Sequence, residues 1–149
     1  MLLLDELVAA TDSSLEASLV VRHDGLFSTS DGRVPAIVGV EYMAQAVAAF
    51  AGVRGIASGE DIKLGLLLGT RNFESSAAYF SVGDRLGVNV SLVLESAAGL
   101  AVFDCRVTGP NVSVTARLTV LRIESMDELR SMISSDGSAA SRGERETES

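Results

Sequence analysis

A single carboxylate, Glu41, lies in the middle of a long run of apolar and small residues, VPAIVGVEYMAQAVAAFAG, at positions 34–52. Burying an unpaired carboxylate costs several kcal/mol or forces it to take up a proton, so this placement favours a functional role. In a helix, Gln45 four residues later would share its face, above the small residues Ala48 and Gly52. Such a carboxylate can act as a general acid or base, on a face that lines a cavity or a subunit seam.

The chain has one histidine, His23, and one cysteine, Cys105. Cys105 lies beside Asp104 with no histidine near it in the sequence, which favours a small core residue over a nucleophile. A lone cysteine forms no intrachain disulfide, and this is typical of a cytoplasmic protein. No group of Cys, His and carboxylates has metal-ligand spacing, so we expect no metal, and no motif indicates a cofactor.

The run at 34–52 predicts one long helix. Pro35 suits its first turn, alanine is abundant, and Gly52 followed by Arg-Gly can end it. Because the helix is apolar nearly all round, we expect other elements to wrap it. Glu41, Gln45 and the glycines argue against a membrane span.

Apolar and polar residues alternate in the second half of the chain, which is the period of half-buried strands. LGVNVSLVLES, LAVFDCRVT and NVSVTARLTVLRI predict a three-strand antiparallel meander from Leu86 to Ile123. Strands are also expected at 2–9 and 15–21, and in LGLLLGTRNFE after the helix. This order predicts an α+β fold in which a curved antiparallel sheet surrounds one buried helix.

The length of 149 residues is most simply one domain, which we place at residues 1–133. Ser125 and Glu128 have capping-box spacing and predict a short helix over about 125–133. Residues 134–149 have almost no apolar side chains, so we expect a disordered tail.

The net charge of −8, with 12 basic residues scattered along the chain, excludes a stripe that could follow a phosphate backbone, so nucleic acid is not an expected partner. The hydrophobic fraction of 47% without tryptophan favours an oligomer. The first residues, MLLLDELV, lack the basic region of a signal peptide. We therefore expect a cytoplasmic protein with no membrane partner.

EYMAQAVAAFAG, which begins at Glu41, resembles the start of the central helix of bacterial 3-hydroxyacyl-(acyl carrier protein) dehydratases, where Glu or Asp precedes xMAQ. FSVGDRLGVNVSLV, at 80–93, is similar to a turn and strand of the same hot-dog superfamily. The resemblance spans roughly 2–123, and GLLLGTR with VFDC is similar to small dehydratase-like proteins of aryl-polyene and related lipid pathways. It implies a hot-dog fold and a dimer whose two sheets join edge to edge.

The resemblance also implies site residues. It makes Glu41 the catalytic carboxylate and Gln45 its neighbour, and it matches the backbone N–H groups of Ala36 and Ile37 to the turn that binds the thioester oxygen. The family usually has Gly where Ala36 stands. Arg71 is a candidate for the phosphate of acyl-phosphopantetheine, for neutralising Glu41, or for an exposed strand-end arginine.

The family histidine has no obvious counterpart. In the family it lies in the loop before the helix and comes from the other subunit, whereas the matching positions here hold Ser28, Thr29 and Ser30. His23 lies some five residues or more too early, at a predicted strand end, and would reach the site only if the loop folds back. Losing a general base removes a contribution of roughly 10²–10⁴-fold.

Three functions remain open on this sequence. The first is a dehydratase that converts carrier-bound 3-hydroxyacyl chains to 2-enoyl chains. The second is a catalytically reduced hot-dog subunit that pairs with an active dehydratase, and the third is an acyl thioesterase that uses the carboxylate to activate water. The expected partners are an acyl carrier protein and, as a homodimer or heterodimer, another hot-dog subunit.

Overall fold

The computed structural model describes residues 3–23, 29–59, 64–123, 130–131 and 133–134. Its elements in chain order are β1 (Glu6–Ala10), β2 (Ser14–Val20), β3 (Arg33–Pro35), the 3₁₀ turn η1 (Ala36–Val38), α1 (Gly39–Ser58), β4 (Leu64–Ser75), β5 (Tyr79–Ser81), β6 (Arg85–Glu95), β7 (Leu100–Thr108) and β8 (Ser113–Ile123). Of the helix predicted over about 125–133, only Arg130, Ser131 and Ile133 are described, and they are helical. Ser134, the first residue of the predicted tail, is also helical, and the rest of that helix and of the tail lie outside the described residues.

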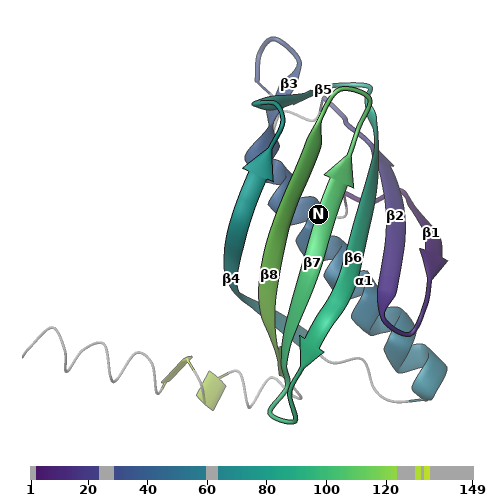
Figure 1. Ribbon diagram of the computed structural model, residues 1–149, viewed down its shortest axis with the longest axis vertical. Helices are drawn as coiled ribbons and strands as arrows, with labels where there is room; N and C mark the ends of the chain where they lie inside the picture. The colour runs from purple at the N-terminus through teal and green to yellow at the C-terminus, as the bar shows by residue number, and fades with distance from the viewer. Residues whose placement is uncertain (1–2, 24–28, 60–63, 124–129, 132, 135–149) are drawn as a thin grey trace, which may run out of the picture.

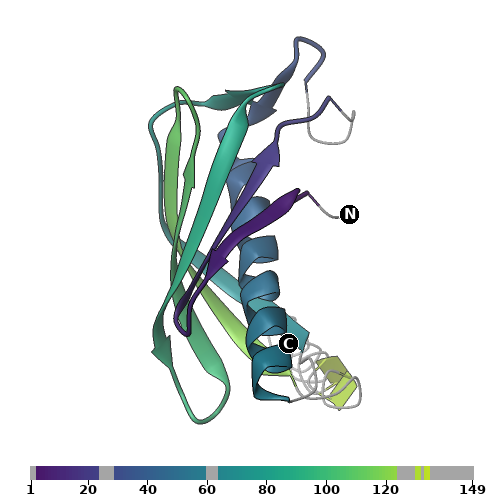
Figure 2. The same ribbon diagram turned by 90° about the vertical axis from the view of Figure 1, so that its right-hand side faces the viewer.

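Six strands form one antiparallel sheet in the order β1-β2-β6-β7-β8-β4, and β3 pairs with β5 in a separate ribbon. Figure 1 shows this sheet face-on with α1 behind it, and Figure 2 shows the sheet curving around one side of the helix. The predicted meander is confirmed as β6, β7 and β8, and the strand expected after the helix is confirmed as β4. The short strands β3 and β5 were not predicted, because three residues are too few for an alternating pattern to be recognised.

The core lies between the inner face of the sheet and α1. Alternate residues of the meander point inward and are buried, including Leu86, Val88 and Val90 of β6 and Phe103, Cys105 and Val107 of β7. The helix contributes a stripe at helical spacing, made of Gly39, Tyr42, Met43, Ala46, Val47 and Phe50. The rings of Phe50 and Phe103 meet edge to face at 5.5 Å between centroids, which fixes the middle of the helix against β7.

The sequence predicted that the helix ends near Gly52, but it ends at Ser58. A glycine inside a helix costs only about 1 kcal/mol relative to alanine. The turn beyond Gly52 is held to the sheet by Arg54, whose guanidinium donates to both carboxylate oxygens of Glu95 on β6 at 2.7 and 3.0 Å. Gly59 then ends the helix in the left-handed conformation, with φ of 72°.

The sheet covers α1 on one side only. Glu41, Ala48 and Ile56 on its other side are exposed, with Ile56 at 74%. The expected enclosure of the helix is therefore not completed within one chain, because six strands of this curvature reach only part of its circumference. By length and composition alone residues 36–58 are also apolar enough to cross a membrane, although in this fold their buried side chains form the core.

Candidate active site

Glu41 lies in the first turn of α1, on the exposed side of the helix. A negative charge there is favoured by the helix dipole, whose positive end is at the N-terminus. The N-cap residue, Val38, makes no side-chain cap to the backbone N–H groups of that turn. The result is a carboxylate open to solvent at the positive end of the helix.

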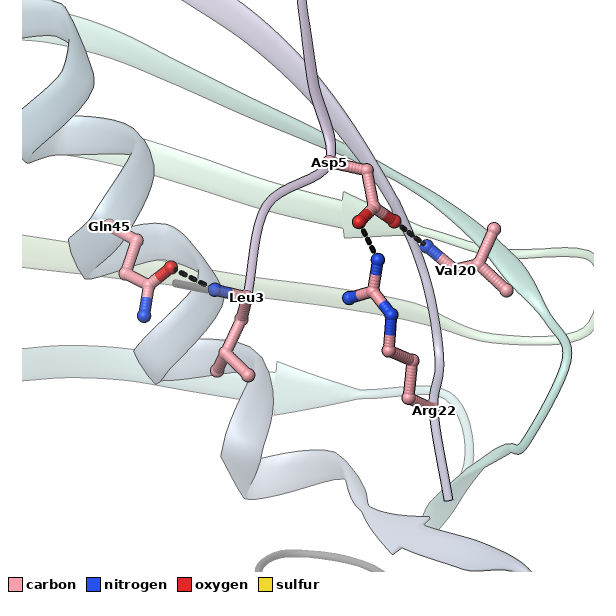
Figure 3. A network of polar contacts seen from close by, with 5 residues as sticks. All are labelled: Leu3, Asp5, Val20, Arg22 and Gln45. Atoms are coloured by element: carbon pink, nitrogen blue, oxygen red, sulfur yellow. Dashed lines mark hydrogen bonds and ion pairs between the residues drawn. The ribbon is translucent and has the colours of Figure 1, made fainter. Parts of the chain in front are cut away.

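Gln45 connects Glu41 to residues near the start of the chain. Its Nε2 donates to Oε1 of Glu41 at 3.4 Å, and its Oε1 accepts the backbone N–H of Leu3 at 2.7 Å. Figure 3 shows Leu3 beside the helix, with its backbone nitrogen towards the side-chain oxygen of Gln45. The structure therefore brings the predicted pair together and adds a third member that sequence spacing could not reveal, since Leu3 is 42 residues away.

The turn that leads into the helix is fixed from outside. The backbone N–H of Ala36 donates to the carbonyl of Ala78 at 2.9 Å, just before β5. Within the described residues no hydrogen bond is found for the N–H of Ile37, and its side chain is 58% exposed. Of the two predicted backbone donors, Ile37 is thus the one left open towards solvent.

The start of the helix packs against the sheet and β5 at Gly39. A Cβ at this position would lie 3.4 Å from Cζ of Phe80 and 3.6 Å from Cγ1 of Val114. Both of those side chains are fully buried in the closely packed core, so the start of the helix is held in one position. Gly39 thereby helps to position Glu41, two residues further on.

His23 is exposed and follows β2 by three residues. No hydrogen bond or ion pair between His23 and Glu41 is found in the part of the chain that the structure describes. Among the residues at the family's histidine position, Ser28 lies outside the described residues. Thr29 donates its hydroxyl to the carboxylate of Asp31 and accepts the N–H of Arg33 at 3.3 Å.

A polar cluster next to the helix start was not predicted. The guanidinium of Arg33 pairs with Asp31 at 2.6 Å and lies over the ring of Tyr79, 4.2 Å from its centroid. The hydrogen bond from Thr29, and then the one from Arg33, lower the pKa of Asp31 below its usual value. The sequence signal for this turn was the Asp-Gly pair in SDGRV, but only the pairing of β3 with β5 brings Tyr79 to Arg33.

Arg71 lies on the opposite side of the sheet from the helix. It stands opposite Arg117 in the β4–β8 register, while its neighbour Thr70 stands opposite the buried Leu118. Because strand residues alternate between faces, Arg71 takes a position on the outer face. The structure therefore does not bring Arg71 and Glu41 together within one chain, and its predicted contact with a phosphate stays a prediction.

Cys105 is a buried core residue, as the sequence predicted. Burial, with a contribution from Asp104, raises the pKa of its thiol to about 12, so little thiolate is present near neutral pH. Among the described residues no group of three or more His, Cys, Asp or Glu side chains could hold a metal ion. Within the described part of the chain, Glu41 thus stays the candidate acid–base group.

Comparisons with known proteins give a family match and structural matches. A family model described as ApeP-like, ApeP dehydratase, matches residues 1–133. A chain of the dehydratase heterocomplex ApeI:P from Xenorhabdus doucetiae is 27% identical over 89% of each chain, with a TM-score of 0.80. No protein of curated function matches the sequence.

More distant structures show the fold alone. A hypothetical thioesterase from Streptococcus pneumoniae TIGR4, solved with coenzyme A, is 14% identical over 80% of this chain and 88% of its own, with a TM-score of 0.58. The protein smu.793 from Streptococcus mutans UA159, bound to acetyl-CoA, is 13% identical over 80% and 90%, with a TM-score of 0.58. Together these matches confirm the predicted hot-dog fold.

Proposed function

Because the chain belongs to the ApeP-like dehydratase family, we propose that it takes part in the dehydration of 3-hydroxyacyl thioesters that an acyl carrier protein delivers on phosphopantetheine. The observation that carries this proposal is Glu41, exposed in the first turn of α1 and bonded through one oxygen to Gln45. The alternative is the related role of a catalytically reduced subunit, which supplies part of a site shared with an active dehydratase. A cytoplasmic location is part of the same proposal.

In the proposed reaction a base removes a proton from C2, the C2=C3 double bond forms, and the hydroxyl leaves C3 with a proton as water. Glu41 exchanges one of these protons, and a base on a neighbouring subunit handles the other. The N–H of Ile37 donates a hydrogen bond to the thioester oxygen as negative charge develops on it, since the N–H of Ala36 already donates to the carbonyl of Ala78. The reaction needs no cofactor.

A second hot-dog subunit is the partner that this chain requires. β4 is the last strand of the sheet, so its outer edge has unpaired backbone groups, and it carries exposed apolar side chains at Leu66, Leu67, Leu68 and Phe73. The exposed side of α1, with Glu41 on it, also has to be closed against water. Pairing through β4, with a second copy or with a different hot-dog subunit, would satisfy the edge of β4 and cover the exposed side of α1.

The direct test is the product made from a synthetic 3-hydroxyacyl carrier protein, measured by mass spectrometry of the intact carrier. Dehydration removes one water from the carrier-bound chain and leaves the thioester in place. Release of the free acid instead would indicate a thioesterase and contradict the proposal. The assay is run with the protein alone and with a histidine-bearing hot-dog partner.

Leu68→Asp is expected to weaken pairing through β4. Leu68 is 52% exposed at an irregularity in the β4–β8 register, and an aspartate would leave a charge in an apolar interface. We expect analytical ultracentrifugation to show monomer at micromolar concentration. Leu94→Asp on β6, where the leucine is 58% exposed but lies away from that edge, is the control and should leave the oligomer intact. Equal effects of the two changes would argue against β4 as the interface.

A further inference from the structure

Residues 3–5 precede β1 and contact the helix through Leu3, and they are held in place without being part of a strand or helix. Leu3 and Leu4 are 8% and 7% exposed and belong to the core. The backbone N–H of Asp5 donates to the carbonyl of Ser18 on β2 at 2.9 Å. Two buried side chains and a backbone hydrogen bond therefore fix where this segment lies relative to α1.

The carboxylate of Asp5 adds a second attachment. Its Oδ2 accepts the N–H of Val20 at 2.7 Å, and its Oδ1 accepts the guanidinium of Arg22 in an ion pair (Figure 3). The Asp5 side chain is 29% exposed, whereas the aspartates paired with Arg33 and Arg117 on the surface are 54% and 55% exposed. Hydrogen bonds to an ionised carboxylate are stronger than neutral ones, so this clamp ties the segment to the end of β2.

The segment presents the N–H of Leu3 to Gln45, and this contact determines which way the Gln45 amide points. An amide has an acceptor oxygen at one end and donor hydrogens at the other. With Oε1 on the N–H of Leu3, Nε2 faces Oε1 of Glu41. A flipped amide would set donor against donor at Leu3 and carbonyl oxygen against carboxylate at Glu41, so both contacts would become repulsive.

The arrangement leaves one oxygen of Glu41 available. Oε1 accepts a hydrogen bond from the Gln45 amide, and among the described residues no hydrogen bond to Oε2 is found. An acid–base group works best when the reacting oxygen has a fixed direction and the other oxygen is held. The orientation of the Gln45 amide therefore bears directly on the direction of Oε2.

We propose that Leu3, through its backbone N–H, and Asp5, through its clamp on β2, are positioning residues for Glu41. They act through the Gln45 amide, whose orientation the segment sets. The inference rests on the proposed function for its catalytic consequence, but the orientation of the amide itself can be measured without any turnover.

Leu3→Pro removes the N–H that holds Gln45, because proline has no backbone donor. Leu4→Pro is the matched control: Leu4 is equally buried, and no hydrogen bond of its N–H is found in the described part of the chain. The readout is the side-chain NH₂ signals of Gln45 in ¹⁵N-labelled protein, assigned as the pair that Gln45→Leu removes. We expect Leu3→Pro to shift these signals and speed their exchange with water, whereas Leu4→Pro leaves them close to the parent.

Asp5→Ala serves as a second variant in case a proline here prevents folding. Its control is Asp104→Ala, which breaks the Asp104–Arg117 ion pair on the outer face, away from the helix. In the active assembly, kcat should fall about 5-fold or more for Asp5→Ala with KM within about 2-fold, as expected for loss of orientation rather than of binding. Asp104→Ala should change neither constant.

The proposal would be overturned if the Gln45 signals of Leu3→Pro matched those of Leu4→Pro and the Gln45 signals of Asp5→Ala matched those of Asp104→Ala. If the parent protein fails to dehydrate any 3-hydroxyacyl carrier in any assembly, the proposed function fails instead. The amide signals would still show whether residues 3–5 orient Gln45, so the two failures are distinguishable.

Discussion

Glu41→Gln is expected to lower enoyl formation by about 10²–10⁴-fold, the contribution of one general acid–base group. Glutamine keeps the shape of the side chain but can neither take up nor release the proton. Because Glu41 is exposed, the fold should be retained, with a loss of about 0.3–1 kcal/mol from its favourable place in the first helical turn. The assay is carrier-bound enoyl formation by mass spectrometry, with thermal unfolding measured on the same samples.

Glu74→Gln is the control for the change of charge. Glu74 is exposed on β4, opposite Thr115 in the register and therefore on the outer face. This variant should keep the parental rate and the parental unfolding temperature. Parental turnover by Glu41→Gln would show that Glu41 is not the catalytic carboxylate.

The second prediction concerns the missing loop histidine. The purified protein alone should be nearly inactive, and a hot-dog partner that carries a histidine in the loop before its helix should restore turnover. His23→Ala should leave the restored rate within a few fold, because His23 is exposed and has no described contact with Glu41. Rates are compared for the protein alone, for the partner alone and for their mixture.

A partner variant without its own helix carboxylate sharpens this experiment. In that mixture the partner supplies the histidine and this chain supplies the carboxylate, so turnover should depend on Glu41. If His23 were the base, His23→Ala would cost as much as Glu41→Gln, and the double variant would lose little more. Brisk activity of the protein alone that survives His23→Ala would contradict both the shared site and a histidine base.

The meander and the helix could be predicted because their signals are local. Alternation from Leu86 to Ile123 predicted three strands, and β6, β7 and β8 follow it closely. The EYMAQ sequence singled out Glu41 and Gln45 because a spacing of four residues places them on one helical face whatever surrounds the helix. Strand alternation and helical spacing depend only on residues close together in the sequence, so both could be predicted from it.

The predicted end of the helix was wrong, and the additional turns make a tertiary contact that the sequence does not reveal. Gly52 is a reasonable stop signal, but Arg54 reaches Glu95, which is 41 residues away, and the helix continues to Gly59. The sheet face that Arg71 occupies likewise depends on the tertiary structure. Its face follows from the register of β4 on β8, which the strand sequence by itself does not specify.

By itself the sequence determined that Glu41 and Gln45 share one helical face, and it determined the elements around them, because periodicity and helical spacing act over a few residues. Only the tertiary structure decided what surrounds that pair. It covered one side of α1 and left Glu41 exposed, and it brought Leu3 to Gln45 across 42 residues of chain. Contacts of this kind form when segments far apart in the sequence bury apolar surface together, and the periodicity of a short sequence does not predict which segments these are.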